Sequence, residues 1–551
     1  MEKLKPKLFS VMKTYTKQQF VKDVISGIIV AIIALPLSIA LAIASGVSPD
    51  KGIYTAIVAG FIVSFLGGSR VQIAGPTAAF ATIVAGIATT KGMNALIVAT
   101  IMAGVIMILM GLLRLGGLIK YIPYTITTGF TAGIAITILV GQIKDFLGLS
   151  YAEGTPNIET IDKVKNVFHY ILDTNPWALL VGGVSLLILI VWPYINKLIP
   201  ASLIAVLVGS AMVAIFDLDV YTIGTQFKDL KGGLPTVKFP VFSFTLVRDM
   251  LPDAFTIAIL ASIESLLSCV VADSMVNSKH RSNMELIAQG AGNIASVCLG
   301  GIPATGAIAR TAANIKNGGR TPIAGMVHSI VLVLVMLFLM PYAKLIPMPT
   351  IAAILFVVAY NMSGWRKCVK IVKSAPKSDI IVFVVTFVLT VIFDLVVAIE
   401  VGILLAAVLF MKRMSDVTEV EGWKYADDEN DPDALSLKVV PKHTVVYELS
   451  GPLFFAVADK IMTISLKETD KCLVLRMRSV NAIDITAMNT LEELYRECKK
   501  KGIVIVMSHV NEQPMNVMKK AGFCELIGEE NFCPHIDVAL ARAQEICEKE
   551  V

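Results

Sequence analysis

Long apolar stretches separated by short polar turns fill most of this chain, from about residue 24 to residue 411. Several of them reach the roughly 20 residues that an α-helix needs to cross a bilayer at 1.5 Å per residue. The pattern predicts fourteen membrane segments, seven in each half of this region. They cover residues 24–44, 51–67, 76–90, 95–113, 124–148, 176–195 and 200–216, and then 251–274, 285–299, 304–317, 321–341, 345–361, 378–394 and 395–411.

Two matching interruptions break this pattern. Residues 67–80 read GGSRVQIAGPTAAF, residues 300–311 read GGIPATGAIART, and each opens a short apolar segment. The third and tenth segments are too short to span alone, so they should lie buried in protein rather than face lipid. Short Gly/Pro-interrupted segments at corresponding positions of two halves point to a transporter binding site. Two half-helices that start near the bilayer midplane would direct their N-terminal N–H groups at one point, which favours an anion.

The composition fits a membrane protein with a soluble tail. Hydrophobic residues make up 55% and charged residues only 17% of the 551 residues, and the mean hydropathy is +0.73. This composition excludes a soluble enzyme, and nothing in the chain indicates nucleic-acid binding. Charges are frequent only near the two ends. We therefore divide the chain into a basic N-terminus (1–23), a transmembrane domain (24–411), a linker (412–440) and a C-terminal domain (441–551).

The lysine-rich start sets the expected orientation. By the positive-inside rule the N-terminus stays in the cytoplasm, and an even number of spans puts the tail on the same side. An acidic run over residues 427–433 indicates a flexible linker. The eight cysteines are scattered and predict neither a disulfide framework nor a zinc site, so we expect no metal and no cofactor.

The tail has a different pattern, with β-like runs between helix-like ones. We expect strands over residues 444–449, 472–477 and 503–507, and helices over 456–467, 486–501 and 513–521. Strands that alternate with helices predict a small α/β domain.

Glu264 is the most informative single residue. It lies within the apolar run 255–272 and has no other charge nearby. An ionisable side chain inside a membrane helix is costly and by default marks a functional site. Burial disfavours the ionised carboxylate unless a cation binds, and a proton or a sodium ion could enter there with the substrate. A hydrogen bond from Glu264 to a neighbouring helix is the structural alternative.

Arg310 is the second candidate, because it falls within the tenth segment beside the expected half-helix start. Its fixed positive charge could attract an anion, or it could only neutralise Glu264. Residues 304–307 could offer backbone N–H groups, and Thr77 could do the same at the third segment and add a hydroxyl. Pro36 interrupts the first span and should kink it.

These residues resemble the SulP anion transporters. The resemblance is carried by residues 301–311 (GIPATGAIART), 317–325 (NGGRTPIAG), 262–268 (SIESLLS), 272–273 (AD) and 393–395 (FDL). The tail resembles the STAS domain (sulfate transporter and anti-sigma factor antagonist), through residues 448–455 (ELSGPLFF) and 482–487 (AIDITA). The motifs occur in the expected order over nearly the whole chain.

The resemblance implies an α-helical polytopic membrane protein with fourteen transmembrane segments in two inverted repeats of seven, followed by a small cytoplasmic α/β STAS domain. It further implies a core domain (segments 1–4 and 8–11) that moves like an elevator against a gate domain (segments 5–7 and 12–14), and a homodimer. The implied anion site comprises Thr77, Ala78, Ala304, Thr305, Gly306, Ala307, Ala309, Arg310, Leu37, Ser38 and Leu41, and the implied coupling-ion site Glu264 and Ser268.

Departures from the family pattern leave the substrate open. Leu37 is apolar where many animal relatives have Gln, and Thr77 matches the cyanobacterial bicarbonate transporters of the family. Those sodium-coupled proteins have Asp in place of Glu264 and lack the arginine at position 310, whereas Glu is common in bacterial members considered proton-coupled. Sulfate, bicarbonate and short dicarboxylates all remain candidates.

Thr486 occupies the position that is phosphorylated in regulatory STAS proteins, two residues after an Asp. We expect it more often to be an N-terminal helix cap than a phosphate acceptor. The tail could bind a cytoplasmic protein partner.

The sequence therefore predicts secondary active uptake of a small anion across the inner membrane, with both termini cytoplasmic. An uncoupled anion channel or an exchanger is the main alternative. A receptor-like scaffold and a nucleobase transporter are others, although the latter would lack the tail.

Overall fold

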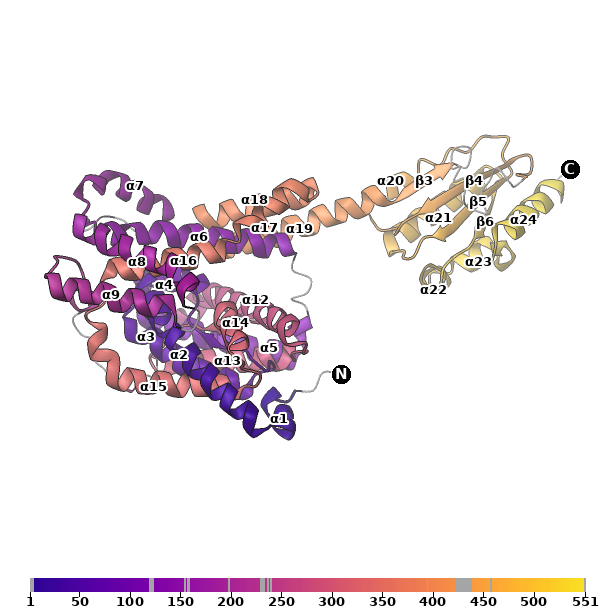
Figure 1. Ribbon diagram of the computed structural model, residues 1–551. Coiled ribbons are helices and arrows are strands. Elements are labelled where there is room, and N and C mark those ends of the chain that lie inside the picture. The colour runs from indigo at the N-terminus through magenta and orange to yellow at the C-terminus, as the bar shows by residue number, and fades with distance from the viewer. Residues whose placement is uncertain are drawn as a thin grey trace. The chain divides into compact units, whose positions relative to one another are not determined.

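A computed structural model gives the fold (Figure 1), which divides into two compact units, residues 1–403 and 404–551. The structure describes residues 4–117, 123–152, 155, 159–196, 199–227, 233–234, 237, 240–393, 395–422, 439–455 and 458–549. The acidic run expected to form a flexible linker, residues 427–433, lies outside the described residues.

Each of the fourteen predicted segments coincides with a helix. In the first half these are α2 (Lys17–Ala44), α3 (Pro49–Leu66), α4 (Ala78–Thr90), α5 (Gly92–Leu112), α6 (Tyr124–Leu147), α8 (Pro176–Ile195) and α9 (Ala201–Phe216). In the second half they are α12 (Leu251–Val276), α13 (Ser282–Cys298), α14 (Ile308–Lys316), α15 (Ile323–Ala343), α16 (Met348–Ser363), α18 (Lys377–Ile392) and α19 (Leu395–Val417). Within the described residues, eight stretches are long and apolar enough to cross a membrane: α2, α3, α5, α6, α8, α12, α15 and the stretch Met348–Ser374, which consists of α16 and a second helix, α17 (Trp365–Ser374).

Several short elements lie in stretches that the hydrophobic pattern left as loops. They are α1 (Lys7–Val11), η1 (Met12–Thr14), α7 (Thr160–Tyr170), η3 (Ile171–Asp173), α10 (Ile223–Gln226), α11 (Phe244–Asp249) and α17 (Trp365–Ser374). Their amphipathic or very short sequences give no apolar run long enough to register as a segment.

The helices of the first unit pack as two bundles. The core bundle comprises α2–α5 and α12–α15, in which α13 packs on α5 and α3, and α15 packs on α2 and α3. The gate bundle comprises α6, α8, α9, α16 and α18, with α6 packed on α16 and α18 (Figure 1). Small residues bring the core helices close, since a Cβ on Gly104 would lie 2.7 Å from the Gly290 carbonyl oxygen. Such close packing of small residues is the usual source of helix association in membranes.

The second unit contains a five-stranded sheet in the order β3-β4-β5-β6-β7. The strands are β3 (Glu419–Gly422), β4 (Thr444–Ser450), β5 (Cys472–Ser479), β6 (Val504–Ser508) and β7 (Phe532–Cys533), and only β3 runs antiparallel to its neighbour. Alternate residues of β5 enter two separate apolar cores, one on each face, so both faces of the sheet are covered. The helical elements are α20 (Ala458–Ile461), α21 (Ile485–Lys500), α22 (Glu512–Lys520), α23 (Phe523–Ile527), η6 (Glu529–Asn531) and α24 (Ile536–Lys549).

Two expectations for the tail were wrong in extent. Within the described residues, the helix expected over residues 456–467 is the short α20, which ends at Ile461, and a turn follows in which the Asp470 carboxylate accepts a hydrogen bond from the Lys467 N–H at 2.7 Å. Part of the expected linker is ordered instead, since α19 continues to Val417 and β3 follows. Lys460 holds this junction by donating to the carbonyl oxygens of Ser415 and Thr418, each at 2.7 Å.

The interpretation of Thr486 as a helix cap was also wrong. The N-cap of α21 is Asp484, whose carboxylate accepts from the Ala487 N–H at 2.8 Å and from the Phe455 N–H at 2.8 Å. Thr486 is the second residue of the helix, and its side chain is exposed. An ionised carboxylate also interacts more favourably than a hydroxyl with the positive end of the helix dipole.

We predict that Asp484→Ala destabilises α21 by about 1 kcal/mol, because the first turn loses its acceptor. Hydrogen exchange of the α21 amides in the full-length protein should become roughly fivefold faster. Thr486→Ala is the matched control and should change the stability by less than about 0.5 kcal/mol. Equal effects of the two substitutions would contradict the assignment of the cap.

Candidate anion-binding site

The two predicted interruptions lie directly against each other. Two-residue strands β1 (Ala74–Gly75) and β2 (Thr305–Gly306) pair antiparallel, with Ala74 opposite Gly306 and Gly75 opposite Thr305. The pairing continues from the Ala307 N–H to the Ile73 carbonyl at 2.8 Å. Helix α4 starts just after β1, and α14 starts just after β2. Segments more than 200 residues apart therefore begin their half-helices at one place, as the sequence predicts.

Side chains provide hydrogen-bond partners for the backbone N–H and C=O groups around this crossing. Asn293 of α13 accepts from the Ala304 N–H at 2.8 Å and donates to the Ala304 carbonyl at 2.9 Å. Thr311 accepts from the Ile73 N–H at 3.0 Å, and Asn314 donates to the Val71 carbonyl at 2.9 Å. Non-helical backbone at membrane depth is tolerated only where protein groups pair with it, and these side chains provide that pairing.

Glu264 of α12 touches both interruptions. Its Oε2 accepts a hydrogen bond from Thr77 Oγ1 at 3.0 Å and another from Thr305 Oγ1 at 2.9 Å. The two hydroxyl oxygens are themselves 3.2 Å apart. Glu264 and Thr77 are half-buried, whereas Thr305 is fully buried. One carboxylate thus lies between the two half-helix starts.

The half-helix starts have no side-chain caps. Thr77 is the N-cap of α4, but its hydroxyl is directed to Glu264 and makes no capping bond. Ala307, the N-cap of α14, has no side-chain acceptor. The first N–H groups of a helix lack partners inside the helix, so those of Ala78 and Ala309 are donors that an anion can use. Ala309 is exposed and Ala78 is buried.

The guanidinium of Arg310 lies behind the crossing. Arg310 is 1% exposed, and its Nη2 donates to the Pro76 carbonyl oxygen at 3.0 Å. A Cβ on Gly75 would collide with Arg310 Nη1, so glycine is required for this approach. Within the described part of the chain, no ion pair joins Arg310 to Glu264. Arg310 therefore contacts the crossing through the Pro76 carbonyl and the Gly75 backbone rather than through the Glu264 carboxylate.

Ser268 lies one turn beyond Glu264 and contacts a residue that the sequence did not single out. Its hydroxyl donates to Gln72 Oε1 at 2.9 Å, and Gln72 Nε2 donates to the Ser265 carbonyl at 3.0 Å. The Ser265 hydroxyl accepts from the Gly306 N–H at 3.0 Å. Gln72 and Ser265 thus fasten both interruptions to α12. An amide between apolar residues in the run VQIAG was the signal that could have identified Gln72.

The three candidates of α2 lie near Pro36, which the helix accommodates without ending. Ser38 and Leu41 are buried, and Leu37 is half-buried. Within the described residues, no hydrogen bond joins the Ser38 hydroxyl to the Glu264 cluster. The buried Ser38 hydroxyl therefore has hydrogen-bonding capacity that no described protein group uses.

A cavity of about 590 Å³ runs between the two bundles and follows the half-helix α4. Helix α4 contributes Thr82 and Gly86 to its lining, α12 contributes Thr256, and the gate bundle contributes Thr137 and Thr390. Thr256 precedes Glu264 by eight residues, or about 12 Å along the helix. The cavity therefore approaches the site from the end of the protein where α4 ends and α12 begins.

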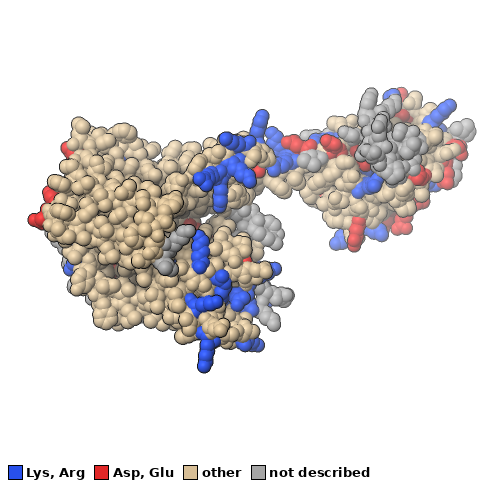
Figure 2. Space-filling model, viewed as in Figure 1, with Lys and Arg blue, Asp and Glu red and all other residues tan. Residues whose placement is uncertain are grey.

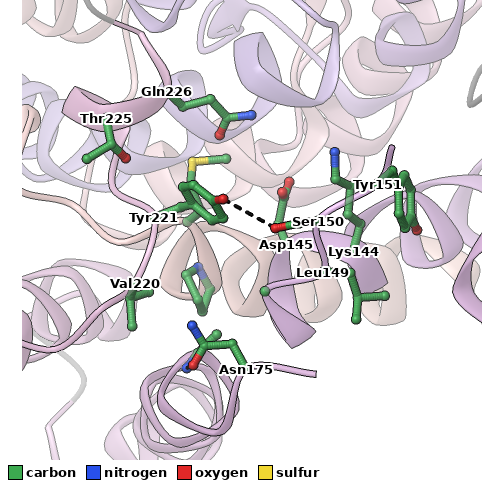
Figure 3. A pocket seen from close by; sticks show the side chains of 14 residues that line it. Lys144, Asp145, Leu149, Ser150, Tyr151, Asn175, Val220, Tyr221, Thr225 and Gln226 are labelled. Atoms are coloured by element: carbon green, nitrogen blue, oxygen red, sulfur yellow. Dashed lines mark hydrogen bonds between the residues drawn. The ribbon is translucent and has the colours of Figure 1, made fainter. Parts of the chain in front are cut away.

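A second pocket, of about 240 Å³, holds none of the candidate residues (Figure 3). It lies where the end of α6, the start of α8 and the start of α16 meet. The Ser150 and Tyr221 hydroxyls are hydrogen-bonded at 3.2 Å across it, and Lys144 lies 4.8 Å from the centre of the Tyr151 ring.

Comparison with known proteins identifies the family. The model of the Sulfate permease family matches residues 20–386, and that of the STAS domain matches residues 435–539. The chain belongs to the sulfate permease family. This member is 39% identical to "Putative sulfate transporter YvdB" of Bacillus subtilis (strain 168), over 95% of this chain and 98% of that protein. It is 32% identical to bicarbonate transporter BicA of Picosynechococcus sp., over 88% of each chain.

Solved structures agree with this assignment. The transmembrane domain of a cyanobacterial BicA superposes on this sulfate permease family member with a TM-score of 0.62 and 30% identity, covering 71% of this chain and 98% of that one. SLC26A9 superposes with a TM-score of 0.87, over 98% of this chain and 93% of that one. At 19% identity the second likeness shows the fold alone. The protein is thus a multi-pass membrane protein of an anion-transporting family, which is not a family of enzymes.

We predict that Gly306→Ala destabilises the site by about 1–3 kcal/mol, because its Cβ would collide with the Gln72 amide. The thermal unfolding midpoint of the purified protein in detergent should fall. Gly86→Ala in α4 is the matched control, because a Cβ there meets no atom within 4 Å. The control should leave the midpoint unchanged or raise it slightly. An unchanged midpoint for Gly306→Ala would show that the site is loosely packed.

Proposed function

We propose that this protein is a secondary active transporter that takes up a small anion by proton-coupled symport with an elevator motion. The anion would be bound by the N–H groups that begin α4 and α14, and Glu264 would carry the coupling proton. The observation that carries this proposal is the Glu264 carboxylate between Thr77 and Thr305, at the junction of both half-helices.

The position of Glu264 provides a physical reason for coupling. Two unit negative charges 4 Å apart repel each other by about 4 kcal/mol at an effective dielectric constant of ~20. An anion at the half-helix starts would therefore favour the protonated, neutral form of Glu264. By linkage, a proton on Glu264 would strengthen anion binding by the same factor. Uptake of a lone anion opposes a negative-inside potential by about 2.3 kcal/mol per 100 mV, which a co-transported cation offsets.

Sodium is the alternative coupling ion. Glu264 Oε2 and the hydroxyl oxygens of Thr77 and Thr305 are three hard oxygen atoms within hydrogen-bonding distance of one another, and such oxygens also suit a small cation. An inward proton gradient and an inward sodium gradient therefore distinguish the two coupling ions in the uptake experiment below.

The packing of the first unit supports an elevator motion. Glu264, Thr77, Thr305 and Arg310 all belong to the core bundle, so a rigid movement of this bundle would carry the whole site. The cavity between α4, α12 and the gate bundle follows the boundary along which the two bundles would slide.

The substrate class is an inorganic oxyanion or a short dicarboxylate. Relatives of this chain are named for sulfate and for bicarbonate, and the half-helix N–H groups would accept any of these anions. We therefore retain sulfate, bicarbonate and fumarate as candidates.

An uncoupled anion channel or an exchanger is the second candidate function. In either case the field of buried Arg310 would attract the anion, and in a channel Glu264 would need no titration.

We also infer that both termini are cytoplasmic in an inner-membrane homodimer. Lys and Arg side chains gather at one end of the 1–403 unit, where α1 lies (Figure 2), as the positive-inside rule expects. The exposed Thr486 remains a candidate phosphorylation site at which a cytoplasmic partner could bind.

We predict that Glu264→Gln abolishes gradient-driven accumulation, because glutamine keeps the shape but cannot take up a proton. Uptake of labelled sulfate, bicarbonate and fumarate would be measured in proteoliposomes with an inward proton gradient, an inward sodium gradient or neither. Asp249→Asn, which removes an exposed carboxylate of α11, is the control and should keep full activity. Equal flux without a gradient, unchanged by Glu264→Gln, would favour a channel or an exchanger.

We predict that Thr77→Val lowers the initial rate of coupled uptake about tenfold, whereas Thr77→Ser retains most of it. Valine keeps the size of the side chain but removes one of the two hydroxyl donors to Glu264, and a hydrogen bond to a charged group is worth about 1.5–3 kcal/mol. The initial uptake rates of the two variants and the wild type would be compared under the gradient that drives accumulation in the Glu264→Gln experiment. Equal loss in both variants would assign Thr77 a packing role instead.

A further inference from the structure

Helix α17 is a separate surface helix between α16 and α18. Gly364 ends α16 in the left-handed conformation (φ 53°), and α17 starts at the next residue. A left-handed residue at a helix end redirects the chain, so Trp365–Ser374 does not continue α16. It contains Trp365, Arg366, Lys367, Cys368, Val369, Lys370, Ile371, Val372, Lys373 and Ser374, with no acidic residue.

Three faces follow from the 100° that each residue turns in a helix. Ile371 is 7% exposed and provides the face that packs against the protein, where α17 contacts α6. An apolar stripe comprises Trp365, Val369 and Val372, which are 46%, 41% and 51% exposed. An adjoining basic stripe comprises the exposed side chains of Arg366, Lys370 and Lys373. The helix thus presents an apolar stripe and a basic stripe side by side, away from the protein.

The basic stripe makes no ion pair within the described residues. The Arg366 guanidinium lies over the neighbouring Trp365 ring, whose centroid is 5.5 Å away. Trp365 is anchored in turn, because its Nε1 donates to the Tyr360 hydroxyl at 3.1 Å. Lys367 and Lys377 are also exposed, so the stretch 365–377 presents five cations.

The helix lies at the basic end of its unit. Figure 1 places α17 and α1 at the same end of residues 1–403, and Figure 2 shows Lys and Arg side chains gathered there, including the region of α17. Because the spanning helices end at this side, the exposed apolar stripe would meet the boundary between acyl chains and headgroups.

We infer that α17 is an interfacial helix that binds the headgroups of anionic phospholipids. Trp365, Val369 and Val372 insert at the level of the acyl boundary, a position at which tryptophan is favoured. Arg366, Lys370 and Lys373 then lie at the level of the phosphates, where each cation adds about fivefold to the affinity for an anionic surface. The charge complementarity and the single membrane-facing stripe favour lipid over a protein partner.

Trp365 fluorescence in the full-length protein tests this inference. The other three tryptophans, Trp177, Trp192 and Trp423, are replaced by Phe, and the protein is placed in phosphatidylcholine vesicles. A minor fraction of brominated phosphatidylglycerol or of brominated phosphatidylcholine is added as a contact quencher. We expect quenching by both, about threefold stronger with the anionic lipid, since the basic stripe enriches it nearby.

Charge variants show whether the basic stripe causes this preference. The triple variant Arg366→Gln, Lys370→Gln, Lys373→Gln should lower the ratio of quenching by brominated phosphatidylglycerol to quenching by brominated phosphatidylcholine to about one, because the cations that attract the anionic lipid are lost. The charge-conserving triple Arg366→Lys, Lys370→Arg, Lys373→Arg should keep the preference. The control triple Lys442→Gln, Lys519→Gln, Lys520→Gln, which removes exposed lysines of the STAS domain, should also keep the preference for the anionic lipid.

Three results would overturn the inference. Equal quenching by the two lipids in the wild-type stripe would show a neutral interfacial helix without headgroup selectivity. Absence of quenching by either lipid would show that α17 does not contact the membrane, and a protein partner would then be the better explanation. Loss of the preference in the charge-conserving triple would show that the helix structure, rather than its charge, was responsible.

Discussion

The antiparallel pairing of Ala74–Gly75 with Thr305–Gly306 is the contact on which the rest of the membrane unit depends. A chain that leaves the helical conformation inside a bilayer exposes backbone groups that lipid cannot pair, at several kcal/mol each. Each interruption here supplies partners for the other, and Asn293 and Asn314 supply the remainder. The two half-helices can begin at the same depth only because the non-helical residues before them pair their backbone N–H and C=O groups with each other.

This constraint explains why the hydroxyls of Thr77 and Thr305 are free to hydrogen-bond to Glu264. A threonine before a helix would normally cap it, but the Thr77 hydroxyl is directed across the gap to Glu264. Thr305, held in β2, reaches the same carboxylate oxygen. The uncapped N–H groups and the carboxylate therefore share one location, where a bound anion and a coupling ion would influence each other directly. Gln72 and Ser265 hold this arrangement against α12.

Features that depend on local composition could be predicted from the sequence. Apolar length predicted the helices, the Gly/Pro breaks predicted the half-helix starts, and a lone charge in an apolar run indicated Glu264. Features that depend on side-chain direction could not. The sequence left open whether Arg310 meets Glu264, because the outcome depends on the space beside Gly75. In the tail, β3 is only four residues long (Glu-Val-Glu-Gly), too short for its alternation to stand out in the sequence, so only its pairing with β4 reveals it as a strand.

The opposite charges of Glu264 and buried Arg310 suggest how the proposed transporter could move without carrying a net charge. With Glu264 ionised and the site empty, the two charges sum to zero. With Glu264 protonated and a monoanion bound, the sum is again zero, whereas each half-loaded state carries one unit of charge. Exposing a net charge to the bilayer interior costs several kcal/mol. The core bundle would therefore move readily only when empty or when fully loaded, which is the requirement for tight coupling. A divalent anion such as sulfate would need a second cation to meet the same condition.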